Sequence, residues 1–149
     1  MPPDIQARWT TRRLVGAVTG AFLACRRADF ATLAGFDAAH LPIWFNDVDF
    51  CLRLRRAGRL ILYAPEIVAT HHESRTLSAQ PEDARRRAIW TDSLGAMRRR
   101  WGAALETDPG FNPHFARTGR PFESMIEPSM AAVRAHFVLS SQRNPWLLR

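Results

Sequence analysis

The chain has 149 residues, and 46% of them are apolar. That length and composition exclude wholesale disorder and suffice for one domain with a core. No apolar run approaches the ~20 residues that are needed to span a bilayer, and the first residues lack the apolar region of a signal peptide. We therefore expect a cytoplasmic protein without a transmembrane segment.

The charge is strongly basic and comes from one residue type. The formal net charge is +7, and all 21 basic residues are Arg. Clusters at Arg85–Arg87 and Arg98–Arg100 raise nucleic acid or an anionic membrane surface as partners. No helix-turn-helix, zinc-finger or RNP signature accompanies them, and the absence of Lys indicates a compositional bias. We therefore expect no nucleic-acid function. An Arg-driven nucleic-acid binder is the alternative, and steep salt-dependent binding to any duplex would support it.

The N-terminal part contains a polar lead-in and an apolar run. Residues 1–13 are polar and contain Pro, which indicates a loose lead-in. The run from Val15 to Cys25, VGAVTGAFLAC, is partly β-branched. Its composition predicts a buried strand in which Gly20 lets another group approach the backbone closely. We expect Cys25, and Cys51 further along, to be reduced thiols in the core.

A short helix over residues 26–34 and a loop over residues 36–45 separate this strand from the stretch NDVDFCLRLRRAG. That stretch predicts a helix, since apolar residues recur at near-helical spacing between Asn46, a suitable N-cap, and Gly58, a suitable C′ residue. Its three arginines should lie toward the side opposite the apolar residues.

Two acids, Asp47 and Asp49, fall in the first turn of this helix, where the helix dipole favours negative charge. On a strand they would share a face and could close on one cation, but on a helix they lie roughly 200° apart. We therefore expect no two-carboxylate metal site. Asp49 can form a solvated i,i+4 pair with Arg53. The Asp47 carboxylate can project into whatever precedes the helix, so on the pattern alone dipole and capping chemistry competes with catalysis there.

The rest of the chain predicts two short strands and two helices. The strands cover residues 60–63 and 67–70 and lead into the run HHESR. The longest helix covers residues 81–105, and its apolar stripe indicates core packing, with the Arg clusters largely outside. A last helix is predicted over residues 129–140.

Taken in order, the pieces VTGAFLACRRADF, AGFD, NDVDFCLRLRRAG, LYAPEIVATHHES and DPGFNP resemble the C-terminal half of the catalytic domain of glycosyltransferase family 2. The match covers about residues 14–116, and AGFD departs from the family's usual double Gly. The resemblance implies an α/β fold: the C-terminal portion of a GT-A, Rossmann-like nucleotide-diphospho-sugar transferase with a C-terminal helical extension.

The same resemblance divides the chain into four parts. We expect a lead-in over residues 1–13, the C-terminal half of the GT-A core over 14–76, a helical extension with the DPGFNP tail over 77–118, and a divergent, partly helical tail over 119–149.

The resemblance implies an inverting transfer from a nucleotide-sugar donor to a glycan acceptor, as in polysaccharide or O-antigen-like glycan synthesis. It assigns Asp47 as the general base that deprotonates the acceptor hydroxyl. Asp37 and Asn46 on the acceptor side and Gly20 beside the donor sugar would contribute to sugar binding. Asp49 stays open between sugar binding and a structural ion pair.

The resemblance also implies a Mn²⁺ or Mg²⁺ ion that neutralises the diphosphate of the donor. His71 and His72 are adjacent, so at the end of a strand they point to opposite sides. His71 stands where family members have a metal-ligating His, and a packing or surface role is the alternative. Arg75 would contact a phosphate, with a solvated Arg as the alternative. The family's main metal ligands are an Asp-x-Asp pair in its N-terminal half. That pair is distinct from Asp47 and Asp49 and has no counterpart here.

The family's nucleotide-binding N-terminal half has no counterpart in residues 1–13. We therefore expect a fragment, a truncated gene product or one half of a split enzyme, inactive alone. A parallel sheet would expose an edge to the missing half, which becomes an expected partner. A peripheral position at the inner face of the membrane stays open. A non-catalytic remnant that binds a partner or a glycan is the alternative.

Overall fold

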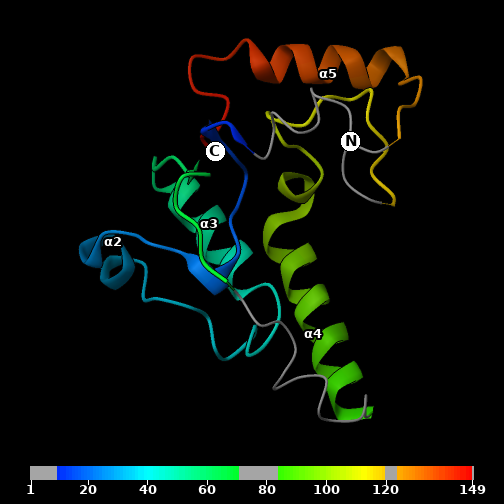
Figure 1. Ribbon diagram of the computed structural model, residues 1–149. Coiled ribbons are helices and arrows are strands. Elements are labelled where there is room, and N and C mark those ends of the chain that lie inside the picture. The colour runs from blue at the N-terminus through cyan, green and yellow to red at the C-terminus, as the bar shows by residue number, and fades with distance from the viewer. Residues whose placement is uncertain (1–9, 71–83, 120–123, 149) are drawn as a thin grey trace.

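The computed structural model describes residues 10–70, 84–119 and 124–148. The described elements are, in order, β1 (Arg13–Leu14), η1 (Gly20–Phe22), α2 (Arg27–Thr32), α3 (Asn46–Arg56), β2 (Leu62–Tyr63), α4 (Ala84–Trp101), η2 (Gly102–Leu105) and α5 (Met130–Ser140). In Figure 1, α3 lies between α2 and α4, and α5 lies across the top of the view beyond the C-terminal end of α4.

The sheet formed by the described residues is one antiparallel pair of short strands, β1 and β2. Leu14 lies opposite Leu62, and the Val15 N–H continues the pairing with a 3.0 Å hydrogen bond to the backbone carbonyl of Ile61. This mixture of helices with a small sheet is compatible with the α/β class. The expectation of a parallel sheet is wrong for this part of the chain, because β1 and β2 run in opposite directions.

The predicted strand over residues 15–25 is also wrong. The segment turns into η1, where the Thr19 side chain accepts a 3.3 Å hydrogen bond from the backbone N–H of Ala21. Cys25 is exposed, contrary to expectation, whereas Cys51 is buried, and both are free thiols. An apolar run becomes a strand only where a neighbour pairs with its backbone. Within the described residues, that neighbour is limited to the segment around β2.

The predicted strand over residues 67–70 is absent as well. Ile67 instead closes a turn, donating its backbone N–H to the carbonyl of Ala64 at 3.1 Å. The helix predicted over residues 26–34 is confirmed as α2, and the chain leaves it through Ala34 and Gly35, both with φ near +60°.

Helix α3 confirms the predicted helix, but its start differs. The N-cap is Phe45, in the left-handed region at φ 65°, and it provides no side-chain capping bond. Asn46 is therefore the first helical residue and not the cap. Gly58 follows the C-cap with φ 79°, as predicted for a C′ residue. The tight entry through Phe45 joins the loop over residues 36–45 directly to the first turn of α3.

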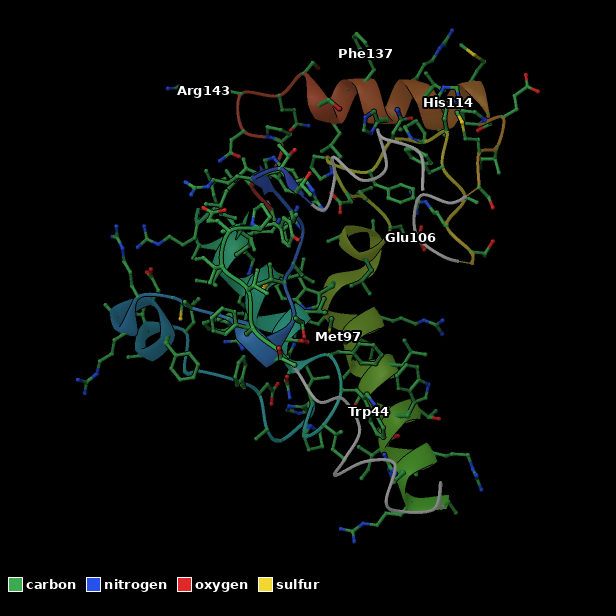
Figure 2. All side chains as sticks on the ribbon, in the orientation of Figure 1. Trp44, Met97, Glu106, His114, Phe137 and Arg143 are labelled. Carbon is green, nitrogen blue, oxygen red and sulfur yellow. The ribbon has the colours of Figure 1, made fainter. Side chains whose placement is uncertain are left out.

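Two apolar clusters flank α3. Leu52 packs with Leu41 of the preceding loop and with Met97 and Trp101 of α4. Figure 2 shows Met97 on the side of α4 that faces α3. On its other side, α3 contributes to a second buried cluster, which consists of Phe50, Cys51, Leu54 and Ile61, the residue before β2. The core is thus centred on α3, and the predicted packing role of the α4 stripe is confirmed at Met97 and Trp101.

The prediction that the arginines of α3 lie opposite its apolar residues is wrong for Arg55, because α3 is packed on two sides. The side chain of Arg55 is buried, and its Nε donates to the backbone carbonyl of Trp146 at 2.9 Å. Its Nη1 lies 3.5 Å from the carbonyl of Gly16. Burial lowers the pKa of Arg55, and the charge of Asp108 acts against that shift. The C-terminal tail is thereby bonded to α3.

The last two helices differ in how they pack. Helix α4 is continuous from Ala84 and tightens into η2 at Gly102, where φ is 45°. Helix α5 begins after Ser129, whose side chain accepts from the Ala132 N–H at 3.2 Å, as expected of an N-cap. None of its residues is buried, and Figure 2 shows Phe137 pointing away from the molecule. Within the described residues, no helix has the length and apolar character needed to cross a membrane.

Candidate functional site

The carboxylate of Asp47 lies at the N-terminus of α3, against the backbone of η1. Its Oδ2 accepts a 2.7 Å hydrogen bond from the N–H of Gly20, and its Oδ1 accepts a 2.8 Å bond from the N–H of Val48. Gly20 is exposed and Asp47 is half-buried. Two residues that the sequence singled out, 27 positions apart, are therefore in direct contact at a place that solvent reaches.

The close approach at this contact leaves little room for a side chain at position 20. A Cβ atom placed on Gly20 would lie 3.1 Å from the Cβ of Asp47, closer than nine in ten such contacts. The sequence predicted that Gly20 lets another group approach the backbone, and this is confirmed, although the group comes from α3 and the segment is not a strand.

Asp49 occupies a different environment, although it lies only two residues further on. Its side chain is fully buried. Oδ2 accepts from Arg53 Nε at 2.7 Å, and Oδ1 accepts from Arg100 Nη1 at 2.8 Å and from Trp101 Nε1 at 2.9 Å. The predicted pair with Arg53 is confirmed, but its solvated character is wrong, because α4 covers it. Burial opposes ionisation of Asp49, yet the bonds from Arg100, Trp101 and Arg53 outweigh it and lower its pKa.

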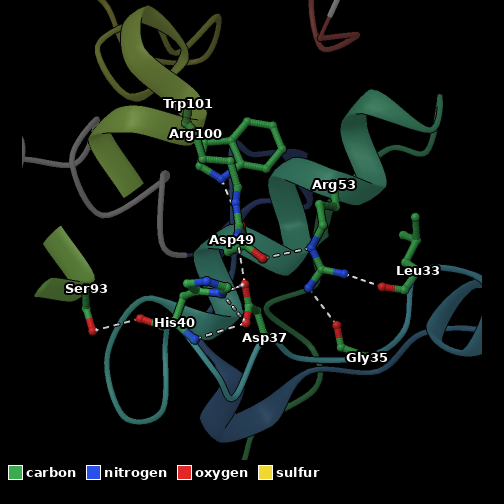
Figure 3. Close-up of polar contacts among 9 residues, drawn as sticks. All are labelled: Leu33, Gly35, Asp37, His40, Asp49, Arg53, Ser93, Arg100 and Trp101. Carbon is green, nitrogen blue, oxygen red and sulfur yellow. Dashed lines mark hydrogen bonds and ion pairs between the residues drawn. The ribbon is translucent and has the colours of Figure 1, made fainter. Parts of the chain in front are cut away.

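Asp37, in the loop before α3, shares Arg100 with Asp49. Arg100 Nη2 donates to Asp37 Oδ2 at 2.6 Å, and both the backbone N–H and the ring Nδ1 of His40 lie 3.1 Å from Asp37 Oδ1. The hydrogen bond from Arg100 is the main reason that the pKa of Asp37 lies far below its usual range, and His40 adds to the effect. Figure 3 shows Arg100 between the two carboxylates.

Arg53 extends the same network toward α2. Its Nη2 donates to the carbonyl of Gly35 at 2.6 Å, and its Nη1 donates to the carbonyl of Leu33 (Figure 3). The guanidinium of Arg53 thus holds the segment after α2 to α3, and the carboxylate of Asp49 neutralises its charge. The first turns of α3 are bonded to three separate segments: η1, the end of α2 and the end of α4.

Asp47 and Asp49 have different partners: Asp47 accepts from backbone N–H groups, and Asp49 accepts from side chains of α3 and α4. Within residues 10–70, 84–119 and 124–148, no group of three potential metal-ligating side chains occurs. The expected metal ligand His71, its neighbour His72 and the expected phosphate contact Arg75 lie outside the described residues. Asn46 is the first residue of α3, immediately before Asp47.

Sequence reasoning missed Arg100 and Trp101 as partners of Asp49 and placed the Arg98–Arg100 cluster largely outside. A usable signal existed. Arg100 lies three residues after Met97 in the apolar stripe of α4, so it borders the face that packs on α3. Arg98 and Arg99 lie roughly 100° and 200° around the helix from Met97, and therefore further from that face.

Comparison with known proteins adds partial relatives. The chain is 31% identical over 136 residues, 91% of its length, to 13% of the uncharacterized protein y4gI of Sinorhizobium fredii. It is 34% identical over 71 residues, 48% of its length, to 23% of a Mycobacterium tuberculosis protein named N-acetylglucosaminyl-diphospho-decaprenol L-rhamnosyltransferase. It is 34% identical over 116 residues, 78% of its length, to 8% of the O-antigen biosynthesis protein RfbC of Myxococcus xanthus.

The chain spans less than a quarter of the length of each of these relatives. No protein-family model matches it, and no solved structure matches it. Two of these three relatives have functional names, one that of a glycosyltransferase and one that of a protein of O-antigen synthesis. These names agree with the type of family that the ordered motifs resemble.

Proposed function

We propose that the chain is the acceptor-side part of a family 2 glycosyltransferase that acts in the synthesis of a polysaccharide or an O-antigen-like glycan. Five motifs in the order of that family support the proposal, as do relatives named as a rhamnosyltransferase and an O-antigen biosynthesis protein. The GT-A fold, the nucleotide-sugar donor and the inverting stereochemistry belong to the proposal through the same resemblance.

The observation that carries the proposal is the environment of Asp47. Its carboxylate is half-buried, lies at a helix N-terminus and is oriented by backbone N–H groups of Gly20 and Val48. A general base must be an oriented acceptor that a substrate can reach. Asp49, by contrast, is buried, and its two oxygens accept bonds from three side chains. Of the two acids in the motif, Asp47 is the one that fits the role of base.

In the proposed reaction, the acceptor hydroxyl gives its proton to the Asp47 carboxylate. The hydroxyl oxygen forms a bond to the anomeric carbon from the face opposite the leaving group. The bond from that carbon to the nucleoside diphosphate breaks, and the diphosphate leaves with the electron pair. The product is the inverted glycoside, and Asp47 later returns its proton to solvent.

The remaining site residues have narrower proposed roles. Gly20, which is exposed beside Asp47, would let the donor sugar approach the backbone. Asn46 would bind sugar from the start of α3. Asp37 and Asp49 hold Arg100, which favours structural roles for both over direct sugar binding.

The proposal also concerns groups beyond the described residues. His71 would ligate Mn²⁺ or Mg²⁺, and Arg75 would contact a phosphate of the donor. The described residues supply no group of three side chains that could hold a divalent cation. Because the chain aligns with less than a quarter of each relative, we propose the activity for a longer or two-part enzyme and expect the chain alone to be inactive.

The test is the Asp47→Asn substitution in an enzyme completed by a nucleotide-binding half. The amide keeps the shape of the side chain and cannot accept the proton, so turnover should fall while binding of the donor persists. Asp92→Asn on the exposed face of α4 is a matched control, since it makes the same chemical change at an exposed position.

A further inference from the structure

Arg100 stands at a junction of three segments. It lies in the last turn of α4, and its two terminal nitrogens bond to acids from different places in the chain. Nη1 binds Asp49 in the first turn of α3, 51 residues away, and Nη2 binds Asp37 in the loop before α3, 63 residues away. A single planar guanidinium therefore fixes the distance between the loop and the helix that follows it.

The end of α4 reinforces this junction from both sides. Trp101 donates its indole N–H to Asp49, and Ser93, which is buried, donates its hydroxyl to the backbone carbonyl of His40 at 3.4 Å. The loop and α3 are thus both bonded to α4, in addition to the apolar contact of Met97 with Leu41.

This junction is adjacent to the proposed base. Asp49 is two residues after Asp47, and its backbone N–H donates to the Phe45 carbonyl at 2.8 Å, within the first turn. The loop held by Asp37 enters α3 through the left-handed residue Phe45. The loop held by Asp37 and the helix turn that carries Asp47 therefore meet at Phe45.

We propose that Arg100 is a positioning residue: by bridging Asp37 and Asp49, it sets the orientation of the first turn of α3 and so maintains the contact between Asp47 and Gly20. The significance of this for catalysis rests on the proposed function, in which Asp47 is the base. The structural part of the claim does not, because the contact can be observed without turnover.

The chemistry of the bridge favours Arg over Lys. Its two carboxylates approach two separate nitrogens of one rigid group, whereas an ammonium is a single point charge on a flexible stem. The side chain of Arg100 is 30% exposed, that of Asp37 is 19% exposed, and that of Asp49 is fully buried. Asp37 can therefore be altered with less risk to the core than Asp49.

The experiment uses NMR on the 149-residue chain well below its melting temperature. The backbone amide signal of Gly20 reports its hydrogen bond to Asp47, and it is recorded for Arg100→Gln, Arg100→Lys and Asp37→Asn. Arg99→Gln is the matched control, since Arg99 is the exposed neighbour on the same helix. We expect Arg100→Gln and Asp37→Asn to move the Gly20 proton upfield, Arg100→Lys to move it less, and Arg99→Gln to leave it in place.

The double variant Arg100→Gln with Asp37→Asn should shift the Gly20 signal by less than the sum of the single variants, because both remove the same bridge. The claim is overturned if these variants lower the melting temperature yet leave the Gly20 signal unmoved, because Arg100 would then only stabilise the fold. If Arg100→Gln does not fold, the Gly20 signals of Asp37→Asn and Arg100→Lys test the claim in the same way. Inactivity of a completed enzyme would count against the proposed function and would not affect this result.

Discussion

The backbone N–H of Gly20 donates a 2.7 Å hydrogen bond to the Oδ2 of Asp47. This contact joins the turn η1 to the first turn of α3 and brings together two of the residues that the sequence nominated for a site. It also sets Asp47 apart from its neighbour Asp49, whose oxygens are both occupied by side chains in the interior.

A methyl group at Gly20 should separate this pair. In Gly20→Ala the new Cβ would meet the Asp47 Cβ at 3.1 Å, and the neighbour belongs to a helix that cannot move freely. We expect a loss of about 1 kcal/mol in unfolding free energy, measured by urea denaturation.

Gly95→Ala is the control for this substitution. Its Cβ would also lie 3.1 Å from a neighbour, but that neighbour is the flexible end of Arg99, and the site is inside α4. We expect it to be neutral or to stabilise by up to about 1 kcal/mol through helix propensity. Equal losses for the two alanines would show that the contact at Gly20 is not tight.

Removal of the buried charge at Asp49 should be costly for stability. Asp49→Asn removes the buried negative charge that Arg53 and Arg100 share, and it replaces one accepting oxygen with an amide group that only donates. Breaking a buried ion pair from one side typically costs about 3 kcal/mol or more. Chemical denaturation should show this loss, while Asp92→Asn on the exposed face of α4 should stay within about 0.5 kcal/mol of the wild type.

The bridge through Arg100 also predicts how stability depends on pH. The pKa values of Asp37 and Asp49 are lower in the folded protein than their ordinary value of 3.8. Their contribution to stability is therefore fully present above pH 3.8 and is lost as the pH falls toward the folded values.

Asp37→Asn removes one of these groups, so its unfolding free energy should fall less steeply than that of the wild type between pH 5 and pH 2. Urea denaturation at several pH values measures both slopes. Parallel curves would show that Arg100 does not lower the pKa of Asp37.

The helices were predictable because their signals are local. Ser129 and Gly58 lie next to the ends of α5 and α3, respectively. The observed bounds of α2, α3 and α5 lie within a few residues of the predicted ones. The strand over residues 15–25 was not, because strand formation depends on a distant partner that composition does not reveal. The apolar run and its glycine correctly indicated a close approach to the backbone at Gly20, but they did not indicate the backbone conformation of the segment.

The site was predictable in part for the same reason. Asp47 and Gly20 could be nominated from motifs, and the pair of Asp49 with Arg53 from i,i+4 spacing. The burial of Arg55 and the bridge through Arg100 depend on which elements pack on α3. The stripe of α4 places Arg100 beside a packed face, but no local pattern identifies a partner 51 residues or more away.

The isolated chain should not turn over a nucleotide sugar, because we propose that donor binding requires residues beyond those of this chain. The measurement is release of nucleoside diphosphate from a panel of nucleotide sugars in the presence of Mn²⁺. Release above background that depends on this chain alone would remove the reason for invoking a missing half.

His71 should control the metal requirement in a completed enzyme. A neutral imidazole that ligates Mn²⁺ strengthens its binding, so His71→Ala should raise the Mn²⁺ concentration needed for half-maximal activity. His72→Ala should leave it nearly unchanged, because the resemblance to the family places the ligating histidine at position 71 and not at position 72. The reversed pattern would show that the match to the family is shifted by one residue, and no effect of either substitution would assign His71 to packing.

The central claim, that Asp47 is the general base, is tested most directly by kcat of Asp47→Asn and Asp49→Asn in an enzyme completed by a nucleotide-binding half, assayed where both variants are folded. We predict that Asp47→Asn lowers kcat by roughly 10²- to 10⁴-fold with little change in donor affinity. Asp49→Asn should lower it far less. Equal losses in the two variants, or full activity in Asp47→Asn, would contradict the assignment.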